Sequence, residues 1–359
     1  MKKRNESAAR ARDSILIVAV SFLLALLVGA VILLLQGENP IEVYNYLLID
    51  PLFSKNGVLK VLGKATPLIF TGLAGTLAFR CNVFNIGREG QLYAGALTAA
   101  MLGYTLQGLP TWLHLSICFA GAMITGALCA FIPAWLKVKF GVHEVITTIM
   151  LNYIISNIIS MLVVNYFRNP GETARTPYVQ DSARLMQFKA PEQVNTGLII
   201  AVVLCIVAYW VFSRTVFGSH VDAAGKNLTA ARYSGINADR LVILTMMLSG
   251  AVAALGGLER SLGAFGYMEV NFSPGFGYDG LAICIIARMN PLGVLIVALL
   301  MGLMSYGGLN LNMMTSVPTE WVRVLTGFIF AFVVIGNTLL KQRGGVLFRR
   351  KDAGKEEAA

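Results

Sequence analysis

Residues 14–35 form an apolar run, SILIVAVSFLLALLVGAVILLL, that contains no charged side chain. Its length matches the roughly 20 residues with which an α-helix crosses the hydrocarbon core of a bilayer. The run is too long for the core of a signal peptide, and no A-x-A site follows it, so we expect a retained first span. Only 13% of the residues are charged, against about 25% in soluble domains. The chain is therefore expected to be an all-α integral membrane protein.

Similar apolar runs recur along the chain and predict about ten transmembrane helices. An even number of spans puts both ends on one side, and the basic residues at both ends place that side in the cytoplasm. We expect a cytoplasmic tail at 1–13, a transmembrane domain at 14–340 with a cytoplasmic loop at 214–240 and an external loop at 168–195, and a second cytoplasmic tail at 341–359. The expected spans are 14–35, 58–79, 85–106, 112–136, 145–167, 196–213, 241–259, 276–288, 291–311 and 320–340.

The eighth expected span is too short to cross a bilayer alone and follows the irregular stretch FSPGFG, so it is predicted to be a half-helix. Its start repeats a Gly-x-acid-Gly pattern found near residue 87: Gly87, Glu89 and Gly90 match Gly277, Asp279 and Gly280. By the span count the two helices run in opposite directions. This predicts two inverted five-span repeats, a plan common among transporters, although chance recurrence of a short glycine-rich pattern is the alternative.

Polar residues within the expected spans are candidates for a substrate pathway, because buried polar groups in a membrane are costly unless they are paired or face a cavity. Glu89 and Asp279 can line such a path or can cap the amides of a helix start. Asn152 can line it or bond a neighbouring helix. Amides and hydroxyls offer hydrogen bonds to a polar solute, and aromatic faces offer it a stacking surface. The candidates are Phe84, Asn85, Glu89, Gln91, Asn152, Tyr278 and Asp279.

Glu259 and Arg260 close the seventh expected span, where they can pair with neighbours at the outer face. The small residues around Gly121 and Gly126 suit close helix packing. The polar external loop at 168–195 is either a docking surface for a binding protein or a passive connector.

The cytoplasmic loop contains a polar island, DAAGKNLTAARYSGI, at residues 222–236. Asn227 as N-cap and Gly235 as a left-handed exit predict a helix of about two turns, and Asn237 can cap the next span. A helix this short is unstable alone, so it rests on the protein's own spans or docks a partner. Ala230 and Ala231 are expected to form a smooth small face, with basic side chains free for ionic contacts. The candidate docking residues are Lys226, Asn227, Leu228, Ala230, Ala231, Arg232 and Gly235.

Several function classes are disfavoured by what the sequence contains. The five cysteines are scattered, which favours free thiols over a metal site. The net charge of +10 is explained by membrane topology, without nucleic acid. Neither Gly-Lys pair, at 63–64 or 225–226, is followed by Ser or Thr as a phosphate-binding loop requires. We expect no enzyme and no cofactor of its own, so that any ATP is bound by another chain.

Four stretches together resemble the permease subunits of bacterial ABC importers of the branched-chain amino acid and simple-sugar class, and most of all nucleoside-uptake permeases. They are FNIGREGQLYAGA, GVHEVITTIMLNYI, RTVFGSHVDAAGKNLTAARYSGI and GFGYDGLAICIIARMNPLG, and the resemblance covers residues 58–340. It implies about ten spans, a second permease that is identical or homologous, ATPase subunits that bind ATP and Mg²⁺, an extracytoplasmic binding protein, and a bacterial cell membrane. It also implies that residues 227–235 are the coupling helix, seated in a groove of the ATPase. A permease for ribose or galactose and an ion-coupled secondary transporter are the alternatives, with a membrane enzyme further behind.

Overall fold

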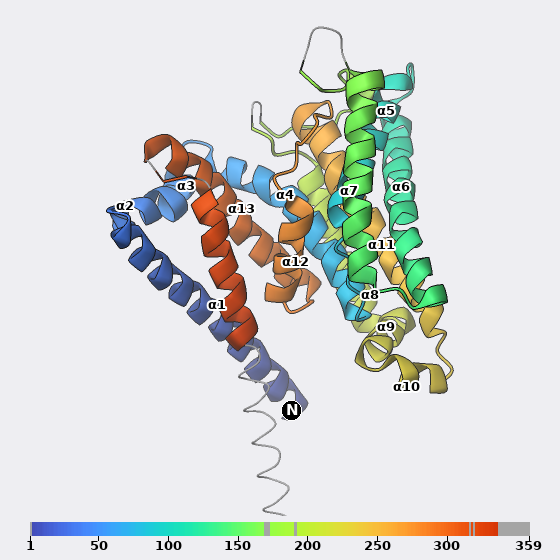
Figure 1. Ribbon diagram of the computed structural model, residues 1–359, viewed down its shortest axis with the longest axis horizontal. Coiled ribbons are helices and arrows are strands. Elements are labelled where there is room, and N and C mark those ends of the chain that lie inside the picture. The colour runs from blue at the N-terminus through green and yellow to red at the C-terminus, as the bar shows by residue number, and fades with distance from the viewer. Residues whose placement is uncertain (1, 169–172, 190–191, 316, 319, 337–359) are drawn as a thin grey trace, which may run out of the picture. The chain divides into compact units, whose positions relative to one another are not determined.

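The structure is a computed structural model that describes residues 2–168, 173–189, 192–315, 317–318 and 320–336, with side chains from residue 19 onward (Figure 1). Within these residues the chain is helical, and its β-structure is limited to two isolated bridges. The expected tail at 341–359 lies outside the described residues. The chain divides into two compact units, residues 1–50 with 307–359 and residues 51–306.

Each expected span corresponds to a helix over most of the residues that the structure describes. Six stretches among the described residues are long and apolar enough to cross a membrane: 57–80, 111–140, 144–167, 197–214, 238–265 and 291–314. They make this a multi-pass membrane protein. The helices that correspond to the expected spans are α1 (Lys2–Leu35), α4 (Gly57–Arg80), α5 (Arg88–Thr105), α6 (Thr111–Phe140), α7 (Glu144–Leu162), α8 (Gly197–Arg214), α11 (Ala238–Leu258), α12 (Phe276–Ile286), α13 (Pro291–Met314) and a helix at 320–336.

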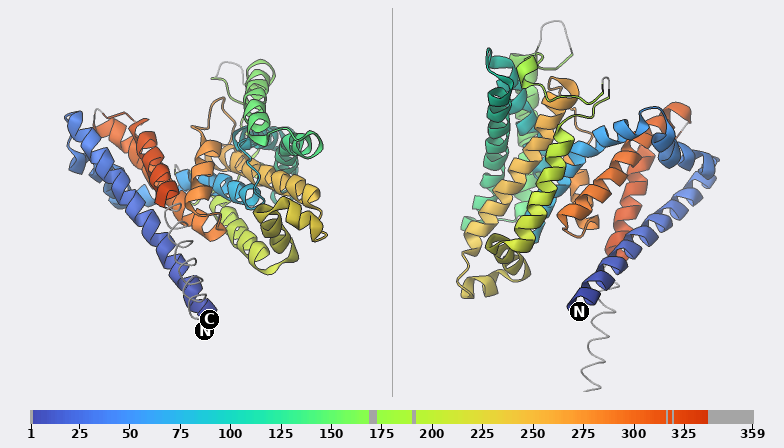
Figure 2. Two further views of the ribbon diagram at one scale, coloured as in Figure 1. Left: turned by 60° about the horizontal axis from the view of Figure 1, so that its bottom comes forward. Right: turned by 180° about the vertical axis from the view of Figure 1, so that it is seen from behind.

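In the larger unit α11 packs against α4, α5 and α6; Figure 2 shows α11 in gold among these helices. Small residues allow the backbones to meet. A Cβ added to Gly126 of α6 would lie 2.3 Å from the carbonyl oxygen of Gly250 of α11, and the reverse holds at the same distance. Close approach of small residues is the usual basis of helix association in membranes, so the packing role expected for Gly126 is confirmed.

The sequence suggested that the seventh span ends at Glu259 and Arg260, but the helix continues past both residues. α11 continues without a break into a π-helical turn, η4 (Glu259–Phe265), in which both charged side chains are buried. The Glu259 carboxylate accepts a hydrogen bond from Asn195 at 2.7 Å, and Arg260 donates to the side chain of Gln193 at 3.0 Å. Both partners belong to the external loop. The two charged side chains therefore find their partners inside the fold, whereas the sequence analysis placed this pairing at the outer face.

The external loop at 168–195 is packed onto the larger unit over its described length. It contains a 3₁₀ turn, η3 (Asp181–Ala183), and isolated bridges from Arg175 to Glu269 and from Gln187 to Asn195. Its buried residues include Val179, Ala183, Leu185, Val194 and Asn195. The loop therefore contributes to the core of this unit, whatever else it binds.

The smaller unit is built from α1, α2 (Pro40–Tyr44), η1 (Asn45–Ile49), the end of α13 and the helix at 320–336; α3 (Asp50–Phe53) lies at its boundary. The Tyr44 hydroxyl donates to the Leu26 carbonyl at 2.5 Å, and its ring lies 6.1 Å from that of Trp321. A Cβ on Gly307 would lie 2.0 Å from the Leu47 carbonyl oxygen. These contacts tie the short helices onto the long ones.

Candidate functional site

The two Gly-x-acid-Gly motifs are in direct contact. A Cβ added to Gly277, at the start of α12, would lie 2.4 Å from the backbone nitrogen of Glu89, in the first turn of α5. Gly280 packs equally closely on Thr71 of α4. Only glycine permits this approach of backbones, because any side chain would collide with main-chain atoms that cannot move away. The motifs thus join α4, α5 and α12 at one point.

The amino end of α12 is capped by side chains. Glu89 accepts a hydrogen bond from the Gly277 amide at 2.6 Å, and Ser273 accepts from the amides of Gly275 and Phe276 at 3.2 and 3.1 Å. Of the two roles left open for Glu89, capping is confirmed, but the helix that it caps is α12 and not its own. Asp279, at the matching position, is half-exposed on α12.

Asn85 and Gln91 form a closed network with Ser249. Asn85 donates to Gln91 at 3.0 Å and to Ser249 at 2.9 Å, and Gln91 donates back to Asn85 at 3.2 Å. Ser249 in turn donates to the Ala74 carbonyl at 2.7 Å. All three side chains are buried. In this structure their polar atoms connect α4, α5 and α11, and a role in a substrate path stays a prediction.

Asn152 joins α7 to the start of α5. It accepts from the Gly90 amide at 2.8 Å and donates to the Ile86 carbonyl at 2.8 Å, with the Tyr278 hydroxyl 3.4 Å away. The interhelical use of this side chain is therefore confirmed. Tyr278 and Phe84 are about two-fifths exposed, at 43% and 39%. We define the polar cluster as Asn85, Glu89, Gln91, Asn152, Ser249 and Tyr278. Tyr278 and Phe84, which precedes Asn85 in the chain, are therefore the accessible aromatic side chains at this cluster.

Arg88 is a buried charge that the sequence reasoning passed over. It is fully buried, and its Nη1 lies 3.5 Å from the Thr71 carbonyl oxygen. Its Nε and Nη2 make no hydrogen bond within the described part of the chain. Gly75 leaves room for it, since a Cβ there would lie 2.0 Å from Nη1. The signal was present in the sequence, because an arginine inside an expected span is itself a sign of function.

The cytoplasmic loop folds into two helices, α9 (Val216–Lys226) and α10 (Leu228–Tyr233). The expected features of α10 are confirmed: Asn227 accepts from the Ala230 amide at 3.0 Å, Gly235 has a left-handed φ of 82°, and Asn237 accepts from the Arg240 amide at 3.1 Å. Helix α9 was not predicted. Its N-cap is Thr215, whose hydroxyl accepts a hydrogen bond from the Gly218 amide at 3.2 Å.

The surface of α10 differs from the expectation. Ala231 is buried in a core with Val221, Leu241 and Met246, whereas Ala230 is exposed. Adjacent residues on a helix point about 100° apart, so the two alanines do not form one face.

Two further side chains of α10 change the expected docking surface. Arg232 is not free, because it pairs with Asp239 at 2.5 Å. Tyr233, which the sequence analysis missed, is 90% exposed and is the largest side chain that α10 offers to a partner.

The connection from α4 to α5, residues 81–87, lies between α9–α10 and the polar cluster. A Cβ on Gly225 would lie 1.9 Å from the Arg80 carbonyl oxygen, and Arg80 pairs with Asp222 at 3.6 Å. Beside this contact lies a small cavity that is lined by residues 81–83 and 224–228. At the other side Glu144 accepts from the Phe84 amide at 3.3 Å and pairs with Lys137 at 2.5 Å. This connection therefore contacts the loop helices on one side and leads directly into the cluster on the other.

Comparison with known proteins settles the class of the chain. The profile of the family described as "Branched-chain amino acid transport system / permease component" matches residues 57–334. The chain belongs to this family. It is a transport component, as the resemblance in its motifs implied.

Three curated relatives of this permease align over most of its length. The guanosine ABC transporter permease protein NupP of Bacillus subtilis is 32% identical, covering 89% of this chain and 92% of that protein. The nucleoside ABC transporter permease protein NupB of Lactococcus lactis is 32% identical, covering 89% and 91%. The glucose ABC transporter permease protein TsgB13 of Haloferax volcanii is 30% identical, covering 92% and 90%.

Proposed function

We propose that this permease is the transmembrane subunit of an ATP-driven importer of nucleosides in a bacterial cell membrane. A separate subunit binds ATP and Mg²⁺, a second permease completes the path, and an extracytoplasmic protein delivers the solute. The chain has ten spans including the half-helix α12, arranged as two inverted repeats with both termini in the cytoplasm. The observation that carries the proposal is the similarity to guanosine and nucleoside permeases over about nine-tenths of the chain.

The ATPase acts on α10. The buried Ala231 and the partly buried Leu228 fix this helix to the permease. Its exposed residues Ala230 and Tyr233 face outward for a partner, together with the exposed Lys226 at the end of α9. A displacement of α9 and α10 reaches Arg80 through Gly225 and continues along residues 81–87 to Glu89 and α12. Packed elements of this kind transmit rigid-body motion because they do not deform continuously. The permease contributes conformational coupling and no chemistry.

The test is Tyr233→Ala in the transporter reconstituted with its ATPase and binding protein. Loss of an exposed aromatic anchor at a docking surface costs about 2 kcal/mol or more of binding, so uptake falls at least tenfold while the amount of permease in the membrane is unchanged. Tyr166→Ala is the matched control, because Tyr166 is also an exposed tyrosine, at 72%, on η2 (Val163–Phe167), away from α10. Equal uptake by the two variants would remove α10 as the site of coupling.

A permease for simple sugars is the second candidate, since a glucose permease is 30% identical to this chain. Competition decides between them. Labelled guanosine uptake is measured against excess unlabelled guanosine, uridine, ribose, galactose or glucose. Competition by nucleosides alone supports the proposal, and competition by sugars alone replaces it. Uptake that stops when ion gradients are collapsed with ATP intact would instead identify an ion-coupled transporter.

A further inference from the structure

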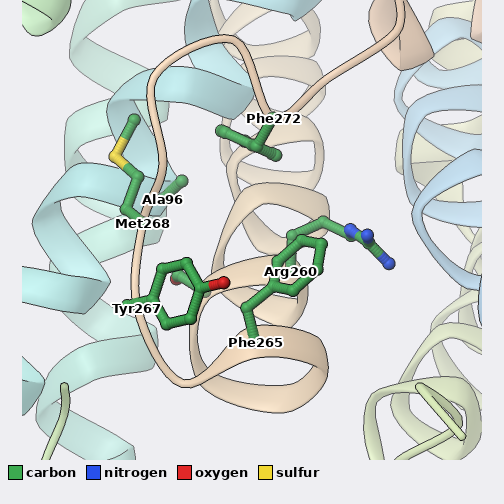
Figure 3. A pocket seen from close by; sticks show the side chains of 7 residues that line it. Ala96, Arg260, Phe265, Tyr267, Met268 and Phe272 are labelled. Atoms are coloured by element: carbon green, nitrogen blue, oxygen red, sulfur yellow. The ribbon is translucent and has the colours of Figure 1, made fainter. Parts of the chain in front are cut away.

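Two hollows of the larger unit differ in whether anything can enter them. Figure 3 shows the first, between α5, η4 and residues 267–272, where the side chains of Arg260 and Phe265 overlap and no space for a water molecule remains. The second is the small cavity beside α10, lined by residues 81–83, Lys137, residues 224–228 and Val242, which we call the loop cavity. It holds about 130 Å³ of space that water can enter, several times what one water molecule needs. Of the two, the loop cavity alone has room for a ligand or for a side chain of a partner.

The lining of the loop cavity is apolar where it is buried and carries hydrogen-bond donors where it is open. Its buried residues are Cys81, Val83, Ala224 and Val242. Its exposed and half-exposed polar residues are Asn82, Lys137, Lys226 and Asn227. Among the described residues, none of those that line it is acidic. A short aliphatic stem that ends in an anionic group matches this division, because ammonium and amide groups donate to an anion.

Lys226 is the basic group of this lining that has no partner of opposite charge. Lys137 pairs with Glu144 at 2.5 Å, which engages one of its three N–H donors. The Asn227 oxygen already accepts from the Ala230 amide, so the NH₂ group is what this side chain can offer. Lys226 is exposed and makes no ion pair within the described residues. A carboxylate in the cavity would therefore meet one uncompensated positive charge and further donors around it.

The acidic side chains on this side of the larger unit are already paired within the chain. In residues 80–82, 137–144 and 214–240 the acids are Asp222, Glu144 and Asp239, and they pair with Arg80, Lys137 and Arg232. The basic residues of the same segments that make no ion pair with the described part of the chain are Lys139, Arg214, Lys226 and Arg240. Complementary negative charge therefore has to come from outside this chain.

We propose that the loop cavity receives an aspartate or glutamate side chain of the ATPase subunit, whose carboxylate pairs with Lys226. The proposal rests on the function proposed above and adds the chemistry of its docking partner. The cavity lies next to α10, on which the ATPase acts, and its volume fits one carboxylate on a short stem, whereas a lipid headgroup is too bulky for it. An inserted carboxylate would contact residues 81–83 as well as 224–228. The ATPase would then hold the loop helices and the connection to α5 together.

The experiment measures binding of the ATPase subunit to the permease complex in phosphatidylcholine nanodiscs. Lys226→Glu places like charges in the cavity, so the affinity is expected to fall about tenfold or more, and the difference from wild type shrinks at high salt. Lys226→Arg keeps the charge and most of the affinity. Lys139→Glu is the matched control and keeps the affinity, because Lys139 is also an exposed lysine without an ion pair in the described residues, on the last turn of α6 and outside the cavity.

A water-soluble carbodiimide gives a second measurement that needs no variant. It joins an ammonium group to a carboxylate in contact with it, so it is expected to link Lys226 to an aspartate or glutamate of the ATPase, identified by mass spectrometry. Lys226→Arg removes this link, because a guanidinium does not form the amide.

Equal affinities of Lys226→Glu and Lys139→Glu, or ATPase cross-links that never include Lys226, would overturn the cavity proposal. A loss of affinity that appears only in discs with anionic lipid would assign Lys226 to the membrane surface and overturn it as well. Failure of the wild-type complex to bind the ATPase at all would instead refute the proposed function itself.

Discussion

At the level of single residues, some structural roles could be predicted from the sequence and others could not. Asn227, Gly235 and Asn237 were predictable because a cap or a left-handed turn is decided by backbone groups within a few residues. Glu89 was only half predictable. A carboxylate at a helix start indicated capping, but the amide that it binds is 188 residues away, and no local pattern identifies such a partner. Arg88 lies in the same motif. Ionisable residues inside a membrane span are candidate functional residues, so this rule would have identified Arg88 from the sequence.

Gly277→Ala is expected to destabilise the permease. An added methyl group would meet backbone atoms of Glu89 at 2.4 and 2.6 Å, and overpacking of this kind costs about 1–3 kcal/mol. Gly327→Ala is the control, since a Cβ there meets nothing within 4 Å and alanine favours a helix by about 1 kcal/mol. Thermal unfolding in detergent checks both. A Gly277→Ala variant as stable as Gly327→Ala would show that the two motifs do not pack as described.

The Asn85–Ser249 hydrogen bond is expected to contribute measurable coupling. Alanine at each position and at both gives a double-mutant cycle, in which interhelical hydrogen bonds in membranes average about 0.6 kcal/mol and reach about 1.7. Because this bond belongs to a buried network at 2.9 Å, we expect a value toward the upper end. Unfolding free energies of the four proteins measure it, and strictly additive losses would contradict the network.

At the scale of elements, the sequence predicted every long helix because each has its own apolar run, but it did not predict how the helices face one another. Ala231 was assigned to a docking surface, yet it faces Val221 and Met246, residues of α9 and α11. Helix α9 was missed because its sequence, VFGSHVDAAGK, has mixed polarity and two glycines. The continuation of α11 through Glu259 was missed because a charged pair is typical of a helix end at an interface.

Asn227→Ala is expected to loosen α10 alone. Loss of an N-cap costs about 1 kcal/mol, which increases opening of this short helix about fivefold. Amide hydrogen exchange at residues 228–233 measures the change. Asn237→Ala provides the comparison, because its cap belongs to α11, and its effect should be confined to the start of that helix. Unchanged exchange at residues 228–233 would mean that packing of Ala231, and not the cap, holds α10.

For the whole molecule, dependence on other chains is the main consequence of the family assignment. The permease profile covers residues 57–334, and the sequence offers no phosphate-binding loop in register. The fold class followed from composition and apolar runs alone. The partners did not, because an exposed helix such as α10 does not identify a binding partner.

The isolated permease, reconstituted in vesicles, is expected to accumulate no guanosine against a gradient even with ATP inside. Adding the ATPase and binding protein should restore accumulation, because in the proposed function the energy for transport enters through α10. Labelled guanosine retained by the vesicles is the measurement. Uphill uptake by this chain alone would contradict the proposed function and favour an ion-coupled transporter.

The caps at the amino end of α12 also bear on anion binding. Its first amides, from Gly275, Phe276 and Gly277, are already held by Ser273 and Glu89. Helix starts with open amides are natural phosphate sites, and this one has none left to offer at those positions. A phosphate group is therefore not expected to bind at this helix start.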